Sequence, residues 1–338
     1  MKSRIDEMLE ELSHAREEVL PSKYWTDLNN RNVRQLNTDG YENFKRTITT
    51  NYFNWVGGVL RPQVQSQYKY LREHLPVGTL LAVSARTLLM GSPQGLSWKH
   101  ILGYKLLTRL VWAYGLQIDS TYHLDSLDEP TEGNPFRIYY GKKLISQDLA
   151  NAFLEFQAVM DSGIDTNAVN SVLELGAGYG RTAYAFLKLK PNIRYIIADI
   201  PPALYVSERY LSSQFADRRI FKFRPFSQFE DVAEEFNQAQ IVFLLPHQLE
   251  LLPDKSVNLA LNISSLHEMV PAQISYYLHQ IDRLTQGHFY MKQWKTWYNP
   301  LDQVQVNEEY PLPKEWSQVF WRECRVQTLF FEALLAIK

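Results

Sequence analysis

Short apolar runs alternate with helix-compatible runs over the second half of the chain. The apolar runs cover residues 172–175, 195–199, 241–245, 257–263 and 287–294. Between them, residues 181–190, residues 202–213 and the segment from Pro271 onward have apolar positions at helical spacing. Strands that alternate with helices in this way predict a mostly parallel sheet covered on both faces, a doubly wound α/β fold.

The first half of the chain is α-rich in pattern. We predict helices over residues 4–20, 79–89, 98–114 and 148–160, and a connecting loop over 115–135. The break within 142–145 therefore separates an α-helical N-terminal region, residues 1–145, from a Rossmann-like domain, residues 146–338. Shorter elements are a strand over 221–224, a helix over 231–236, a helix over 314–322 and a strand over 326–337.

Three alternate glycines, Gly176, Gly178 and Gly180, follow the first of these strands. The order is strand, tight turn, helix, and glycine suits the turn because it tolerates positive φ and exposes bare backbone to a ligand. The spacing is not the dinucleotide fingerprint, because Arg181 stands where its third glycine would fall. Glu174, just before the turn, would repel a pyrophosphate and suits a cationic or amino-bearing ligand.

The segment from Glu174 to Gly180 resembles motif I of the S-adenosylmethionine-dependent methyltransferases, E/D-x-G-x-G-x-G. Asp199 ends the next apolar run, where an acid can accept both ribose hydroxyls of a nucleoside. The alternative for Asp199 is a helix N-cap. Gln248, after the strand 241–245, is a candidate for the adenine edge because an amide both donates and accepts; a plain loop role is the alternative.

Two further strand ends carry candidate chemistry. His267 and Glu268 follow the strand 257–263, and imidazole is the commonest general base for an alcohol nucleophile. Glu268 could orient the ring or bind a substrate hydroxyl, whereas His267 could instead pack under the cofactor. Gln293 and Trp294 end the strand 287–294 and suit a sugar ring, although Trp294 could equally belong to the core.

The aromatic-rich stretch from residue 24 to residue 70 is mostly expected to be core, because aromatic side chains bury so much area. Within it, residues 51–55 alternate amides with rings. Tyr52 and Trp55 are therefore candidates for stacking on a sugar and would make the N-terminal region a substrate cap.

Composition narrows the class of protein. The net charge of −2 gives no electrostatic reason to expect a nucleic acid partner. A single cysteine, Cys324, excludes an internal disulfide, and no apolar run approaches the roughly 18 residues of a membrane span. With a charged rather than signal-like N-terminus, the expected location is cytoplasmic. The helix over residues 4–20 could be a homodimer contact or a lid, but packing on its own domain is favoured.

Five blocks together resemble a bacterial sugar O-methyltransferase family: LELGAGYGR, ADIPPALY, NISSLHEM, FYMKQW and the upstream FKRTITTNYFNW. The resemblance implies S-adenosyl-L-methionine as cofactor, a small-molecule or glycan acceptor, and transfer to a hydroxyl with His267 as base. Since no carboxylate cluster with metal-ligand spacing is evident, no metal is predicted.

Other activities fit parts of the pattern. One is an N- or C-methyltransferase of another small metabolite, and another is a catalytically silent S-adenosylmethionine-binding partner protein. A nicotinamide-dependent oxidoreductase is disfavoured by Arg181 and Glu174.

Overall fold

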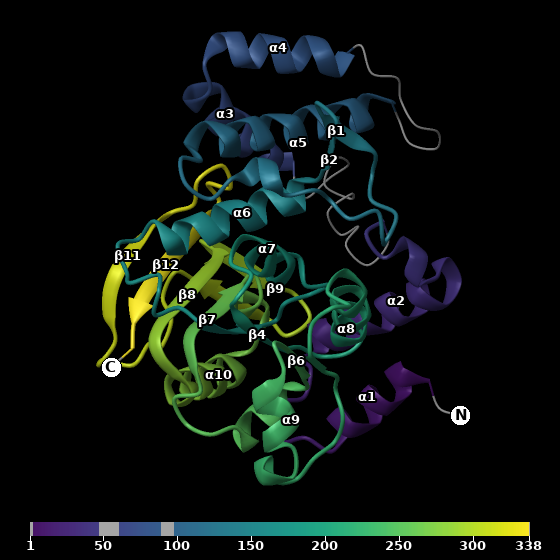
Figure 1. Cartoon of the computed structure of the whole chain (residues 1–338), viewed down its shortest axis with the longest axis vertical. Helices are drawn as coiled ribbons and strands as arrows, with labels where there is room; N and C mark the ends of the chain where they lie inside the picture. Colours follow the sequence, from purple (N-terminus) through teal and green to yellow (C-terminus); the bar gives the residue numbers. More distant parts are fainter. Residues whose placement is uncertain (1–2, 47–60, 89–97, 338) are drawn as a thin grey trace. The chain divides into compact units, whose positions relative to one another are not determined.

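The computed structural model describes residues 3–46, 61–88 and 98–337 (Figure 1). The chain forms two compact units, which we describe separately. The sheet unit takes its residues from 1–34, 159–323 and 330–338, and the helical unit from 35–158 and 324–329. The first 34 residues group with the sheet and residues 146–158 with the helices, while the division of the chain into domains 1–145 and 146–338 stays a prediction.

The sheet unit is built on one large sheet. Within the described residues it has eight strands, in the order β11-β12-β8-β7-β3-β4-β6-β5. Their bounds are β3 Ser171–Leu175, β4 Arg194–Ala198, β5 Ile220–Phe221, β6 Ile241–Leu244, β7 Val257–Ile263, β8 Thr285–Trp294, β11 Ser317–Glu323 and β12 Phe330–Ala336. Across the sheet, every pair of neighbours among β8, β7, β3, β4, β6 and β5 is parallel. Strand β12 pairs antiparallel with both β8 and β11. The predicted fold class, α/β with a mostly parallel sheet and an N-terminal helical region, is confirmed.

Strand β3 lies at the centre, with β4 on one side and β7 on the other. Its residues are buried throughout, as expected of a parallel strand covered on both faces. Because the chain leaves β3 toward β4 and later returns to β7, the strand order reverses here. In open α/β sheets the ligand crevice lies beyond the carboxyl ends of the strands at such a point.

The helices of the sheet unit connect these strands, except for the first, which precedes all of them in the chain. They are α1 Arg4–Ser13, α7 Arg181–Leu189, α8 Ala203–Gln214, α9 Ala233–Gln238 and α10 Pro271–Leu284, with 3-10 helices at Phe229–Asp231, Pro246–Leu251 and Leu266–Glu268. Helix α10 begins at a proline, which suits the first helical turn, and buries Ile274, Leu278 and Ile281. A β-hairpin of β9 Thr296–Asn299 and β10 Val304–Asn307 follows β8.

The prediction of a helix over residues 314–322 is wrong, because this segment forms strand β11. Val319, Phe320 and Trp321 favour a strand, and Phe320 and Trp321 pair with β12 residues Leu334 and Ala333. The helix expected over 4–20 is shorter and ends at Ser13, and of the strand expected over 221–224 only Phe221 lies in a strand, as the last residue of β5.

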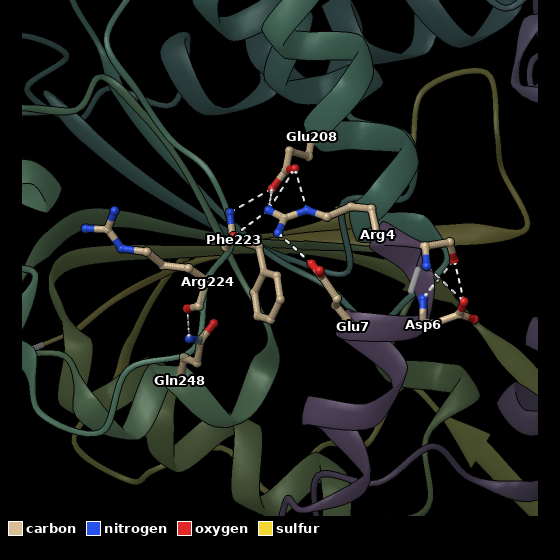
Figure 2. A network of polar contacts seen from close by, with 8 residues as sticks. Arg4, Asp6, Glu7, Glu208, Phe223, Arg224 and Gln248 are labelled. Carbon is tan, nitrogen blue, oxygen red and sulfur yellow. Dashed lines mark hydrogen bonds and ion pairs between the residues drawn. The ribbon is translucent and has the colours of Figure 1, made fainter. Parts of the chain in front are cut away.

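Helix α1 packs on α8 through one arginine (Figure 2). Nε of Arg4 lies 3.2 Å from Glu208 Oε1, and Nη2 lies 3.1 Å from both carboxylate oxygens. Nη2 also donates to the carbonyl of Phe223, whose own N–H donates to Glu208 Oε2 at 2.7 Å. The guanidinium thus joins α1 to α8 and to the segment after β5, within the sheet unit and not within the N-terminal region on which the sequence favoured packing.

The helical unit contains α3 Arg61–His74, α4 Val77–Leu88, α5 Trp98–Ile118, the 3-10 helices Tyr41–Asn43 and Leu124–Ser126, and a hairpin of β1 Ile138–Tyr140 and β2 Lys143–Ile145. Helices α2 Lys23–Asp39 and α6 Gln147–Met160 each cross from one unit to the other in sequence. Cys324 is buried in this unit and forms no disulfide.

Candidate functional site

The turn after β3 places all three predicted glycines in the left-handed region, with φ of 76° at Gly176, 60° at Gly178 and 87° at Gly180. Their surroundings differ. A Cβ on Gly176 would lie 2.3 Å from Ser265 Oγ, whereas nothing lies within 4 Å of a Cβ placed on Gly178. Gly176 therefore permits a close approach of two loops, and Gly178 borders open space from which a ligand can reach the backbone.

Asp199 joins this turn to the end of β4. Its Oδ2 accepts the Gly178 N–H at 2.7 Å, and its Oδ1 accepts the Ile200 N–H at 2.7 Å. Burial raises the pKa of Asp199 to about 7, although these two backbone donors lower it in part. Each oxygen has a second lone pair, so the carboxylate can still accept two hydroxyl groups, as a ribose would require.

Glu174 lies within β3 and is buried, with 1% of its surface exposed. The Tyr195 hydroxyl on the neighbouring strand β4 donates to Glu174 Oε2 at 2.7 Å. The carboxyl is therefore held within the sheet next to the glycine turn. Its predicted contact with the methionine end of a cofactor stays a prediction.

Asn262, in β7, connects β3 to the segment that carries His267. Its Nδ2 donates to the carbonyl of Leu175 at 3.0 Å, and its Oδ1 accepts the Leu266 N–H at 3.0 Å. A backbone carbonyl only accepts and a backbone N–H only donates, so these two contacts fix which end of the amide is oxygen.

The orientation of Asn262 fixes Gln293 in turn. Gln293 Nε2 donates to Asn262 Oδ1 at 2.6 Å and to the Asn262 carbonyl at 3.1 Å, so Oε1 faces the other way. This oxygen lies 2.9 Å from Nδ1 of His267. Since an amide oxygen accepts only, Nδ1 of His267 carries the proton and Nε2 carries a lone pair.

His267 Nε2 is buried and makes no hydrogen bond within the described part of the chain. Burial lowers the pKa of His267 to about 4, so the ring is neutral at neutral pH. A neutral imidazole with a fixed Nδ1–H and a bare Nε2 has the protonation state that a general base requires.

Glu268 does not orient this ring, because Gln293 occupies Nδ1. Its Oε1 lies 3.7 Å from His267 Nε2, too far for a hydrogen bond but close enough for electrostatic interaction. Burial, with the nearby charge of Asp199, raises the pKa of Glu268 to about 8. Two neighbouring carboxyls with raised pKa values characterise this edge of the sheet.

One aromatic ring, Trp297, lies against His267, and sequence reasoning missed it. The Trp297 ring lies edge-on to the His267 ring, with 5.4 Å between their centroids. Its centroid is 5.8 Å from that of Trp294 and 6.4 Å from that of Tyr24. The Trp297 indole N–H is buried and finds no acceptor among the described residues. Trp294, predicted for the substrate, also packs 4.4 Å from Phe330. A sequence signal was available, because Trp297 lies only three residues after Trp294, which was already a candidate.

Two predicted ligand contacts are engaged elsewhere. Gln248 is fully buried, and its amide accepts the Leu245 N–H at 2.9 Å and donates to the Arg224 carbonyl at 2.8 Å (Figure 2). Gln293, predicted for the substrate, holds His267 instead. Tyr52 and Trp55 lie outside the described residues. The structure thus brings Gly178 next to Asp199, and His267 next to Glu268, at the carboxyl ends of the strands.

Metal and membrane features can be stated for the described ranges. Among residues 3–46, 61–88 and 98–337, no group of three or more His, Cys, Asp and Glu side chains is placed to hold a metal ion. No helix in the same ranges combines the length and apolar character that crossing a membrane requires.

The chain matches no protein-family model and no curated protein. Solved structures resemble part of it. A SAM dependent methyltransferase from Aquifex aeolicus is 13% identical over 54% of this chain and 89% of its own, with a TM-score of 0.33. The 1,6-didemethyltoxoflavin-N1-methyltransferase from Burkholderia thailandensis, solved with S-adenosylhomocysteine, is 16% identical over 56% and 78%, with a TM-score of 0.37. The CcbJ methyltransferase from Streptomyces caelestis is 14% identical over 55% and 90%, with a TM-score of 0.36. With TM-scores below 0.5, these likenesses carry no argument about the chemistry of this chain.

Proposed function

We propose that this protein is an S-adenosylmethionine-dependent methyltransferase that methylates a hydroxyl of a sugar or glycosylated metabolite. The observation that carries the proposal is the buried, proton-free Nε2 of His267, which lies on the loop after β7 beside the glycine turn after β3. A base in that state is what an alcohol acceptor needs, because an alcohol is a poor nucleophile until its proton leaves.

The residues around the turn fit the cofactor. The open space beside Gly178 would admit a nucleoside to the backbone, and Asp199 has lone pairs for two ribose hydroxyls. The absence of a third dinucleotide glycine at Arg181 argues against a nicotinamide dinucleotide. When bound, S-adenosylmethionine would supply the activated methyl group.

The chain itself supplies alignment and proton transfer. His267 Nε2 would accept the proton of the acceptor hydroxyl, with Gln293 stabilising the imidazolium through Nδ1–H. General-base catalysis of this kind contributes about 10²- to 10⁴-fold. The Trp297 indole N–H could donate to an acceptor oxygen, and the rings of Trp294 and Trp297 offer apolar faces to a sugar.

Calorimetry tests the cofactor class directly. S-adenosylmethionine, S-adenosylhomocysteine and NAD are titrated into the intact protein side by side. We expect S-adenosylmethionine and S-adenosylhomocysteine to bind saturably and NAD not to bind. Binding of NAD alone, or of none of the three, contradicts the proposal.

His267→Ala tests the base. Turnover should fall by about 10² to 10⁴ while affinity for S-adenosylhomocysteine stays within a few-fold of the wild type. His279→Ala on α10, where the side chain is exposed, is the matched control. Mass spectrometry of the product separates transfer to oxygen from transfer to nitrogen or carbon.

A further inference from the structure

Glu268 has no part in the proton transfer proposed above, although it lies beside the nitrogen that would accept the proton. Its Oε1 is 3.7 Å from the unprotonated Nε2 of His267. Its N–H donates to the Ser265 carbonyl at 3.1 Å, and a Cβ placed on Gly176 would lie 2.3 Å from Ser265 Oγ. The short 3-10 helix that carries Glu268 therefore packs directly against the glycine turn.

Part of the Glu268 side chain is open to a ligand, since 16% of it is exposed, compared with 1% of the His267 side chain. Within the described ranges, no lysine or arginine is among the groups that shift the pKa of Glu268 or of Asp199. The internal ranges outside the description, 47–60 and 89–97, contain neither residue type. Two carboxyl groups thus lie near each other, and no basic side chain of the described residues balances them.

A proton balances one of these two carboxyl groups. Burial, and then the charge of Asp199, raises the pKa of Glu268 to about 8. Two neighbouring carboxylates in a poorly hydrated place do not both ionise readily, so one of them keeps its proton. An opposite charge within about 4–6 Å favours the ionised form and lowers the pKa of a carboxyl by about 1–3 units. A cation that binds beside Glu268 should therefore release this proton.

The ionisable groups that face Glu268 within the described residues come from separate elements. They are His267 on its own 3-10 helix, Asp199 after β4 and Tyr24 on α2. Burial lowers the pKa of His267 to about 4, and burial followed by the charge of Glu268 raises the pKa of Tyr24 above its ordinary value. Both are neutral at neutral pH. Asp199, with a pKa of about 7, and Glu268 are therefore the members of this set that change charge there.

We infer that the Glu268 carboxylate recognises the positive charge of the cofactor, and so favours the sulfonium of S-adenosylmethionine over the uncharged thioether of S-adenosylhomocysteine. The inference rests on the proposed function in taking S-adenosylmethionine to be the cofactor. The methyl group must come within about 3–3.5 Å of the oxygen that His267 Nε2 deprotonates, which brings the charge on its sulfur toward Glu268. By reciprocity, the interaction that lowers the pKa of Glu268 also tightens binding to the ionised carboxylate, by about 10- to 10³-fold.

Calorimetry in phosphate and in Tris, whose ionisation enthalpies differ, counts the protons released when each ligand binds the full-length protein. At about pH 7, S-adenosylmethionine should release roughly 0.4–0.9 of a proton more than S-adenosylhomocysteine, which is the range that a drop of about 1–3 units from a pKa of about 8 gives. Sinefungin has an ammonium group in place of the sulfonium. It should behave like S-adenosylmethionine, which separates the effect of the charge from that of the methyl group.

Glu268→Gln removes the titrating carboxyl, and the difference in proton release between the two ligands should shrink accordingly. Protons exchanged by the ligands' own amino groups are the same in wild type and variant, so the comparison of the two proteins reports Glu268. Above its pKa of about 8, the preference for S-adenosylmethionine over S-adenosylhomocysteine should be about tenfold or more weaker in the variant than in the wild type. Glu315→Gln, at an exposed position before β11, is the control and should leave both quantities unchanged.

The outcomes separate this inference from the proposed function. Equal proton release by the two ligands in the wild type, or a difference that persists in Glu268→Gln, overturns the inference while the proposed function stands. Extra release with S-adenosylmethionine but not with sinefungin also overturns it, because the charge would then not be what is recognised. If neither S-adenosylmethionine nor S-adenosylhomocysteine binds, the proposed function fails and the inference fails with it.

Discussion

His267 owes its state to two backbone groups that it does not touch. The Leu266 N–H and the Leu175 carbonyl orient Asn262, Asn262 orients Gln293, and Gln293 determines which imidazole nitrogen is protonated. Every member of this chain of hydrogen bonds is buried, where a mismatched donor or acceptor is costly. The arrangement therefore specifies one tautomer rather than merely allowing it.

Gln293→Leu should release that tautomer. Without an acceptor at Nδ1 the ring can protonate on Nε2, so kcat should fall by about 10²-fold or more while KM changes little. Nitrogen-15 NMR of the ring should show an unprotonated Nε2 in the wild type and a tautomer mixture in the variant. Gln305→Leu, at an exposed position of β10, is the control. An unchanged ring spectrum in the variant would show that Gln293 does not position His267.

Glu268→Gln tests this half-buried carboxyl, whose side chain is 16% exposed, through the pH dependence of stability. Its folded pKa is about 8 against an ordinary value of 4.5, so between these values the folded protein binds more protons than the unfolded chain. Stability of the wild type should therefore fall as pH rises through this window. The free energy of unfolding of the variant should equal that of the wild type near pH 4. The difference should grow in favour of the variant toward pH 8 and then level off at roughly 1–3 kcal/mol. Urea unfolding at several pH values measures it, and an advantage independent of pH would contradict the assignment.

The sequence was sufficient to place His267, Glu268 and Asp199 at strand ends, because the apolar runs before them are unmistakable. It could not assign Gln293, which is far from His267 in the chain. Only the parallel pairing of β7 with β8 makes the two neighbours. The same limit applied to Gln248, whose amide satisfies backbone groups that no local pattern reveals.

The turn between β3 and α7 combines two different demands on glycine. Gly176 is required because the loop carrying Ser265 approaches it closely, and Gly178 because its φ is positive beside open space. A single motif thus contributes to both stability and ligand access.

Alanine at each position should separate these contributions. Gly178→Ala should cost about 1–2 kcal/mol of stability, from the left-handed backbone, and weaken S-adenosylhomocysteine binding markedly because the Cβ fills ligand space. Gly176→Ala should destabilise more, since its Cβ would clash with Ser265. Melting temperatures and calorimetry of both variants make the comparison. Equal effects on stability, or normal binding by Gly178→Ala, would contradict it.

Prediction of elements worked best where strands are buried on both faces. The runs that became β3, β4, β6, β7 and β8 were each recognised, although β7 and β8 also contain polar residues. Strand β11 was read as a helix because it lies at the sheet edge, where its mixed exposed and half-buried residues give no clear period. Helix α2 was missed because its aromatic and amide content obscured the helical spacing.

The packing of helix α1 depends on the ion pair between Arg4 and Glu208. Glu208 is largely buried, and burial raises its pKa, while Arg4 lowers it. Arg4→Gln should cost about 1–3 kcal/mol by leaving that carboxyl unpaired. Arg16→Gln, which breaks a pair with 70% of the arginine side chain exposed, should cost less than about 1 kcal/mol. Urea unfolding, with Glu208→Gln as the second arm of a cycle, measures the difference; equal costs would refute the role.

At the scale of the whole molecule, polar chemistry is concentrated in two separate places. The sheet unit carries it in loops beyond the strand ends, and the helical unit carries it between helices. The net charge of −2 gives the chain no strong long-range field, so recognition at the sheet edge should depend on short-range hydrogen bonds.

Hydrogen exchange can test whether the cofactor binds at the glycine turn after β3. A ligand that binds only the folded state suppresses the local openings that expose nearby amides. S-adenosylhomocysteine should therefore slow exchange chiefly in residues 175–181 and 199–202. Within α7 and α8 the helix interiors should change little. If S-adenosylhomocysteine instead protected α3 as strongly as the glycine turn, the assignment of the cofactor to that turn would be contradicted.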